Sequence, residues 1–132
     1  MLQSLYLANN SFSGHIPPEL GGLKSMTYLN LLGNHLDGEI PNELSKVWKL
    51  QTLDFSKNNL SRTIPETFNR LENLQFLVLS ENSPVGPIPD NLCDKSRGLQ
   101  HLFMAENNLS GTLPQDLMHC SNLRQLDLSS LQ

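Results

Sequence analysis

The sequence has little of what marks several protein classes. Two cysteines, Cys93 and Cys120, among 132 residues are too few for a disulfide-dense small domain. Basic residues are also scarce, and a net charge of -4 argues against a nucleic-acid groove, which needs a basic face. No apolar run is long enough to span a membrane, and the N-terminus lacks the basic and apolar regions of a signal peptide. A chain of this length then fits one domain.

Catalytic and metal-binding patterns are missing as well. The four histidines, His15, His35, His101 and His119, form no H-x-x-x-H pair, and the adjacent His119 and Cys120 point apart on a turn. There is no phosphate-binding G-x-x-x-x-G-K-[ST] loop, G-x-S-x-G elbow or kinase signature. The sequence predicts a protein that is not an enzyme, with no catalytic residues, no metal and no cofactor.

What the sequence does contain is a repeat. Met26–Lys49 reads L-x-x-L-x-L-x-x-N-x-L-x-G-x-I-P-x-x-L-x-x-L, with Met26 in the first slot. Leu29 and Leu31 alternate with polar residues, which is the pattern of a short, half-buried strand. Leu44 and Val47, three residues apart, can point inward from one helical or 3₁₀ turn. One such unit buries little surface alone, so it must stack on copies of itself.

Copies of this unit fill residues 1–132 as one segment. Repeats start near residues 2, 26, 50, 74, 99 and 123, and the last one is truncated. A long amphipathic helix is excluded because proline recurs at the same offset in every complete repeat. The period of 24 residues between the first two starts lies within the range of leucine-rich solenoids. The departures from the pattern are Arg62 in a glycine slot, Pro84 in a leucine slot, one residue inserted before Leu99, and Leu131 in an asparagine slot.

Two stretches carry a family resemblance. NHLDGEIP at 34–41 and NNLSGTLP at 107–114 resemble the plant-specific leucine-rich repeat, and the resemblance covers essentially the whole chain. It extends to the ectodomains of plant leucine-rich repeat receptor kinases and receptor-like proteins. Residues 88–129 are most similar to the GASSHO and CLAVATA types, in which L-C in one repeat precedes C-x-x-L in the next. In such receptors the kinase is a cytoplasmic domain that this chain lacks.

The resemblance and the stacking together predict an α/β repeat fold. We expect a right-handed leucine-rich repeat solenoid with a parallel β-sheet on the concave face and short helical or 3₁₀ turns on the convex side. The expected strands are 4–8, 28–32, 52–56, 76–80, 101–105 and 125–129. By resemblance, the I-P stretch adds a small second sheet and a superhelical twist. A ladder of structural asparagines should bond backbone groups left free at each bend: Asn10, Asn34, Asn58, Asn82 and Asn107.

Exposed positions of the concave strands are the place to look for function. Aromatic and charged side chains recur there, as on many peptide-binding surfaces. Cross-strand packing alone also enriches aromatic residues in sheets, so both interpretations stay open. The binding candidates are Tyr6, Tyr28, Asn30, Asp54, Phe76, Val78, His101 and Phe103.

The two cysteines lie on the helical side of consecutive repeats. They are either bridged, if their Cα atoms approach within disulfide range, or two buried free thiols. The resemblance to secreted ectodomains favours the Cys93–Cys120 bridge, which a reducing compartment would prevent. Secretion would also allow N-glycosylation at three sequons, which begin at Asn9, Asn59 and Asn108.

Three functions remain open at this stage. The first is a protein- or peptide-recognition module, a fragment of the extracellular ligand-sensing domain of a plant receptor-like kinase or receptor-like protein. Its partners would be a peptide or protein ligand and a co-receptor, at the plasma membrane or cell wall. The second is a structural segment without its own ligand, and the third is a polygalacturonase-inhibitor-like binder of a cell-wall enzyme. Since no cap is seen at either end, an internal fragment that self-associates end to end is expected.

Overall fold

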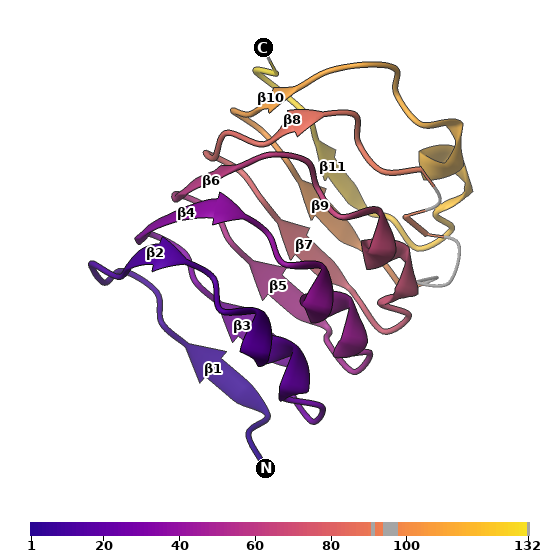
Figure 1. Cartoon of the computed structure of the whole chain (residues 1–132). Helices are drawn as coiled ribbons and strands as arrows, with labels where there is room; N and C mark the ends of the chain where they lie inside the picture. Colours follow the sequence, from indigo (N-terminus) through magenta and orange to yellow (C-terminus); the bar gives the residue numbers. More distant parts are fainter. Residues whose placement is uncertain (91, 94–97, 132) are drawn as a thin grey trace.

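The fold is a stack of coils, seen in a computed structural model that describes residues 1–90, 92–93 and 98–131. Each coil contributes one strand to a six-stranded parallel sheet with the order β1-β3-β5-β7-β9-β11 (Figure 1). The strands are β1 (Ser4–Tyr6), β3 (Tyr28–Asn30), β5 (Thr52–Asp54), β7 (Phe76–Val78), β9 (His101–Phe103) and β11 (Gln125–Asp127). Neighbouring strands in this sheet are therefore consecutive repeats, which is the solenoid predicted from the period.

These strands are shorter than the five-residue strands predicted from the sequence. Each has three residues, although backbone hydrogen bonds between coils continue beyond it. Leu7 N donates to Asn30 O at 2.9 Å, and Asn9 N donates to Leu32 O at 2.7 Å. The backbone hydrogen bonds of the sheet then end, because the residue before each structural asparagine adopts a left-handed conformation. Lys57, which precedes Asn58, is an example, with φ 55°.

Two smaller parallel sheets lie on a second side of the stack. One joins β2 (Ser13–His15), β4 (His35–Glu39) and β6 (Asn59–Ser61), and the other joins β8 (Val85–Gly86) and β10 (Asn108–Leu109). The predicted small second sheet is therefore present, but its strands lie before the I-P stretch, since β4 ends at Glu39, just before Ile40 and Pro41. Every strand of these small sheets ends before the recurring proline of its own repeat, which has no N–H to donate to a ladder.

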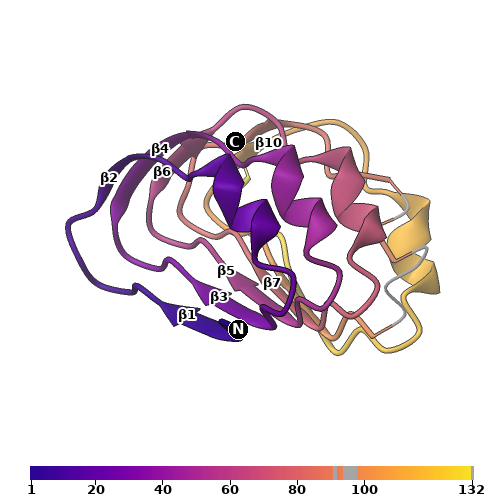
Figure 2. The same cartoon turned by 60° about the horizontal axis from the view of Figure 1, so that its bottom comes forward.

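Short 3₁₀ helices pack on the remaining side (Figure 2). They are η1 (Pro18–Gly22), η2 (Asn42–Lys46), η3 (Glu66–Arg70) and η4 (Gln115–His119). Each begins just after the proline that recurs at the same offset in its own repeat, and this proline is the N-cap with an extended backbone. Leu44, Phe68 and Leu117 point from these helices into a core that the strand leucines Leu29 and Leu53 share.

The predicted asparagine ladder runs along the bend after the strands. Asn58 is buried, and its side-chain nitrogen donates to Leu31 O at 2.9 Å in the preceding coil and to Phe55 O at 3.0 Å in its own. Its oxygen accepts from Leu36 N at 3.0 Å. Asn10 differs, because it is exposed and donates only to Leu7 O and Ala8 O of its own coil.

Pro84 changes this ladder locally. Asn34, Asn58 and Asn82 each accept a hydrogen bond from the backbone N–H in the leucine-type slot of the previous repeat. Pro84 occupies that slot in the fourth repeat and has no N–H, so Asn107 accepts from Asn82 N instead, at 3.0 Å. The small sheet also divides here, between β6 and β8, while Ser83 N still donates to Leu60 O at 2.8 Å.

Arg62 does not disrupt its coil. It adopts φ 62° in the slot where Gly38 has φ 75° and Gly86 has φ 81°. The left-handed conformation is therefore kept although a side chain opposes it. Arg62 O also accepts a hydrogen bond from Val85 N at 2.8 Å in the next coil. The residue inserted before Leu99 falls in the stretch around 94–97, which lies outside the described residues.

Gly21 sets how closely the first two coils stack, which gives a stability prediction. A Cβ at Gly21 would stand 2.4 Å from the backbone oxygen of Glu43 in η2. Gly21→Ala must therefore push η1 away from η2, and we expect the free energy of unfolding to fall by about 1–3 kcal/mol. Urea denaturation followed by far-UV circular dichroism measures this change.

Gly22 provides the matched control. A Cβ there would have no heavy atom within 4 Å, so Gly22→Ala should leave the unfolding midpoint unchanged or raise it slightly. Equal midpoints for the two variants would show that close approach at Gly21 does not limit the stacking of η1 on η2.

Candidate functional site

The candidate site is the exposed face of the six-stranded sheet, called the strand face below. Strand register aligns two columns of outward side chains across the repeats. One column contains Ser4, Tyr28, Thr52, Phe76, His101 and Gln125, and the next contains Tyr6, Asn30, Asp54, Val78, Phe103 and Asp127. All eight binding candidates from the sequence lie in these two columns. The inward positions between them are leucines, buried in the four inner strands, so the face lies directly on the hydrophobic core.

Aromatic side chains on this face gather in two groups. Tyr6 and Tyr28 have ring centroids 4.6 Å apart, and Tyr6 is 67% exposed. Phe76, His101 and Phe103 form the second group, called the aromatic cluster below. The rings of Phe76 and His101 stack with centroids 4.5 Å apart, and Phe103 lies 5.8 Å from His101. The third repeat, with Thr52 and Asp54, separates the two groups.

Two aspartates of the second column are held in one orientation by the same local motif. Asp54 Oδ1 accepts from Ser56 N at 2.9 Å and from the Ser56 hydroxyl at 2.5 Å. Asp127 Oδ1 accepts from Ser129 N at 3.0 Å and from its hydroxyl at 2.7 Å. These bonds from the Ser129 hydroxyl and amide lower the pKa of Asp127. In both motifs a single carboxylate oxygen, Oδ1, accepts the bonds from serine.

Further polar contacts fix side chains around the aromatic cluster. His101 Nδ1 and Gln125 Oε1 are 2.7 Å apart, which orients the imidazole against Phe76. At the end of the strands Lys57 Nζ lies 4.0 Å from Glu81 Oε1. Glu106 follows Glu81 in the same column and lines a small hollow with Asn107, Asn108 and Ser130. The strand face is therefore apolar at its centre and mainly acidic beside it.

The cysteines and two of the three sequons lie away from the strand face, whereas Asn9 lies at the end of the first strand, in the position that Lys57 and Glu81 occupy in later coils. Cys93 and Cys120 form a disulfide with Cα atoms 5.5 Å apart, joining the fourth and fifth repeats on the side of the 3₁₀ helices. The three sequon asparagines are exposed, Asn59 at the start of β6 and Asn108 at the start of β10, while Asn9 is in a left-handed turn with φ 57°.

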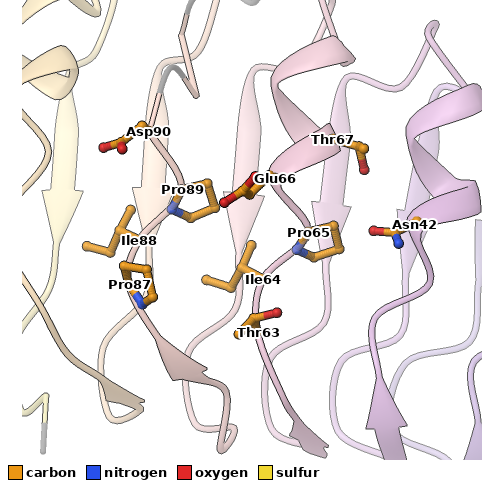
Figure 3. A pocket seen from close by; sticks show the side chains of 10 residues that line it. All are labelled: Asn42, Thr63, Ile64, Pro65, Glu66, Thr67, Pro87, Ile88, Pro89 and Asp90. Carbon is orange, nitrogen blue, oxygen red and sulfur yellow. The ribbon is translucent and has the colours of Figure 1, made fainter.

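A second hollow of about 370 Å³ lies on the flank between the third and fourth repeats (Figure 3). Ile64–Pro65 and Ile88–Pro89 form its floor as equivalent segments of neighbouring coils, and Glu66 and Asp90 stand at its edge. The Thr67 hydroxyl is buried there and has no hydrogen-bond partner among the described residues. Unlike the strand face, this hollow has no aromatic side chain in its lining.

Sequence reasoning missed three features of the site. It did not select Asp127, nor the role of Ser56 and Ser129 in orienting the aspartates, although D-x-S recurs in the same slot at 54–56 and 127–129. It also did not pair Lys57 with Glu81. Among the described residues, no group of three or more His, Cys, Asp or Glu side chains could hold a metal ion. In the same part of the chain, no helix has the length and apolar character to cross a membrane.

The repeat geometry and the comparisons agree on the class of protein. A family model described as Leucine Rich Repeat matches residues 1–23, 25–47, 49–71 and 98–120, more than half of the chain. The chain therefore belongs to the leucine-rich repeat family. The unmatched fourth repeat is the one that contains Pro84 and the inserted residue. No match to this chain was found among curated proteins.

Solved structures place the chain beside plant receptor ectodomains. It is similar to the plant peptide hormone receptor RGFR1 in complex with RGF2, with a TM-score of 0.90 and 37% identity over 92% of this chain and 19% of that one. It also resembles the Arabidopsis thaliana GASSHO1/SCHENGEN3 ectodomain in complex with CASPARIAN STRIP INTEGRITY FACTOR 2, with a TM-score of 0.95 and 34% identity over 99% and 16%. A third similar structure is the Arabidopsis receptor kinase HAESA in complex with the peptide hormone IDA and the co-receptor SERK1. Its TM-score is 0.96, with 37% identity over 99% of this chain and 22% of that one. The chain thus spans at most about a fifth of these ectodomains.

Proposed function

We propose that this chain is a peptide- or protein-recognition segment of the ligand-sensing ectodomain of a plant leucine-rich repeat receptor, and that it binds through the strand face. The observation that carries the proposal is the aromatic cluster of Phe76, His101 and Phe103, which is half-buried on an outward sheet surface beside oriented carboxylates. Rigid aromatic side chains next to polar groups supply much of the binding energy at protein interfaces.

The solved relatives support this assignment at the level of the class. RGFR1, GASSHO1/SCHENGEN3 and HAESA are each described in complex with a peptide or protein factor, and HAESA also with a co-receptor. By analogy, a co-receptor is the second partner we propose for the receptor that contains this segment. We propose recognition as its activity, because stacked aromatic side chains beside oriented carboxylates form its outward surface.

An extracellular location fits both the relatives and the chemistry of the chain. The Cys93–Cys120 disulfide requires an oxidising compartment, such as the secretory pathway. The exposed Asn59 and Asn108 lie in the small sheets, so glycans on these residues would leave the strand face open. We therefore propose that the segment faces the cell exterior, with Asn9, Asn59 and Asn108 as the glycosylation sites.

Peptide selection tests whether the strand face binds ligands. A random peptide library is selected against the oxidised chain, and the affinity of the enriched peptides is then measured for Phe76→Ala and His101→Ala. We expect each substitution to weaken binding by about tenfold, since it removes a central aromatic anchor on the face.

Exposed aromatic residues elsewhere provide the controls. Phe12 is 50% exposed and Trp48 is 48% exposed, and both lie off the strand face. Phe12→Ala and Trp48→Ala should leave the affinity unchanged. Selected peptides that tolerate Phe76→Ala and His101→Ala would contradict recognition by the strand face. They would favour instead a structural segment or a binder that uses another surface, as an inhibitor of a wall enzyme would.

A further inference from the structure

The second column of the strand face has a symmetrical arrangement in its last four strands. From β5 to β11 the aligned residues are Asp54, Val78, Phe103 and Asp127. Two apolar side chains therefore lie side by side, with one carboxylate on each outer flank. Both carboxylates are oriented by a serine two residues later, so they keep a defined separation.

That separation can be compared with the length of a peptide. Asp54 and Asp127 are three strand-to-strand steps apart in the sheet order β5-β7-β9-β11. At about 4.8 Å per step, this distance is about 14 Å. An extended peptide advances about 3.4 Å per residue, so its residues i and i+4 are separated by almost the same distance. Residues i, i+2 and i+4 of an extended chain also point to the same side.

Charge decides which side chains such a peptide would present. The two columns and the residues at the ends of the strands contain four carboxylates, Asp54, Glu81, Glu106 and Asp127, against one lysine, Lys57. Lys57 lies 4.0 Å from Glu81, which leaves the rest of the face acidic. An acidic ligand would be repelled, whereas lysine or arginine next to Phe103 gains a cation–π contact as well as an ion pair.

From these observations we propose that the strand face binds an extended segment of the pattern basic-x-apolar-x-basic, lying across the strands. The two basic side chains contact Asp54 and Asp127, and the apolar side chain packs between Val78 and Phe103. This inference rests on the proposed recognition function and specifies the chemistry of its ligand. A peptide with acidic or neutral residues at i and i+4 would lack both ion pairs.

Synthetic peptides test the spacing directly. Three nine-residue peptides with Gly-Ser flanks carry the cores Lys-Gly-Phe-Gly-Lys, Lys-Lys-Gly-Phe-Gly and Glu-Gly-Phe-Gly-Glu. Chemical-shift titration of the isotopically labelled, oxidised chain gives each affinity. We expect the separated lysines to bind about fivefold tighter than the adjacent lysines of identical composition, and the glutamate peptide to bind weakest. Higher ionic strength should reduce the difference.

Isosteric variants test the two anchors. Asp54→Asn and Asp127→Asn remove charge but keep the oxygen that accepts from serine, and each should weaken binding of the Lys-Gly-Phe-Gly-Lys peptide about threefold. Asp37→Asn makes the same change on β4, where the side chain is 55% exposed and off the strand face, and should have no effect. The variants are expected to fold because these carboxylates are at the surface.

Three results would overturn the proposed pattern. The first is equal affinity for the two lysine peptides, and the second is no shift of the strand-face amides with any of the three peptides. The third is equal affinity of the wild type, Asp54→Asn and Asp127→Asn for the separated lysines. If library peptides still lose binding on Phe76→Ala, the strand face remains the recognition surface and only the ligand charge pattern fails.

Discussion

Asn58→Ala should lower the free energy of unfolding by about 3 kcal/mol, one of the two largest losses that we expect from the chain. The side chain donates to Leu31 O at 2.9 Å, to Phe55 O at 3.0 Å and to Ser56 O at 3.2 Å, and accepts from Leu36 N at 3.0 Å. Alanine removes all four contacts in a buried position and leaves the Leu36 N–H without its acceptor. Urea denaturation with circular dichroism measures the loss.

Two variants separate hydrogen bonding from packing. Asn58→Asp has nearly the same volume but turns the donor toward Leu31 O and Phe55 O into a second acceptor, so it should destabilise at least as much as alanine. Asn10→Ala changes the same slot where the side chain is exposed and bonds only its own coil, so its cost should be below about 1 kcal/mol. Similar losses for Asn10→Ala and Asn58→Ala would rule out the contacts between coils as the source of stability.

The repeat pattern predicts the fold well because the same slots recur. Leu29, Leu53 and Leu77 are each buried in equivalent strands, so the leucine period directly gives the inward face. The sequence was less informative about strand ends and about hydrogen bonds that join neighbouring coils. It placed the second sheet on the I-P stretch, whereas the strands end before the proline. It also could not show that Pro84 redirects Asn107 to the N–H of Asn82, since that bond joins residues 25 apart.

The sequence predicted which residues of the candidate site face outward, but not which of their side chains contact one another. The alternation of the strands assigns Phe76, His101 and Phe103 to the outward side, and the structure adds their stacking and the His101–Gln125 contact. Side-chain rotamers decide such contacts, and a periodic pattern contains no information about them. The oriented aspartates depend on a turn in which Ser56 or Ser129 reaches back two residues, which is a local motif that the sequence displays but the leucine period hides.

Loss of the disulfide should have an effect as large as loss of Asn58. The Cys93–Cys120 bridge closes a loop with a sequence separation of 27 residues. Restricting the unfolded chain to that loop corresponds to about 3–4 kcal/mol of stability. We therefore expect the double variant Cys93→Ala and Cys120→Ala to unfold at a markedly lower urea concentration than the oxidised wild type, by circular dichroism.

Reduction separates the bridge from the packing of the two side chains. Both cysteines are almost fully buried, so their substitution by alanine also removes packing atoms. A thiol reductant should lower the unfolding midpoint of the wild type and leave that of the double variant unchanged, because only the wild type has a bond to break. If reduction left the wild-type midpoint unchanged, or thiol titration of the air-oxidised chain found two free cysteines, the two sulfurs would instead be buried thiols. The fourth and fifth coils would then be joined by packing and hydrogen bonds alone.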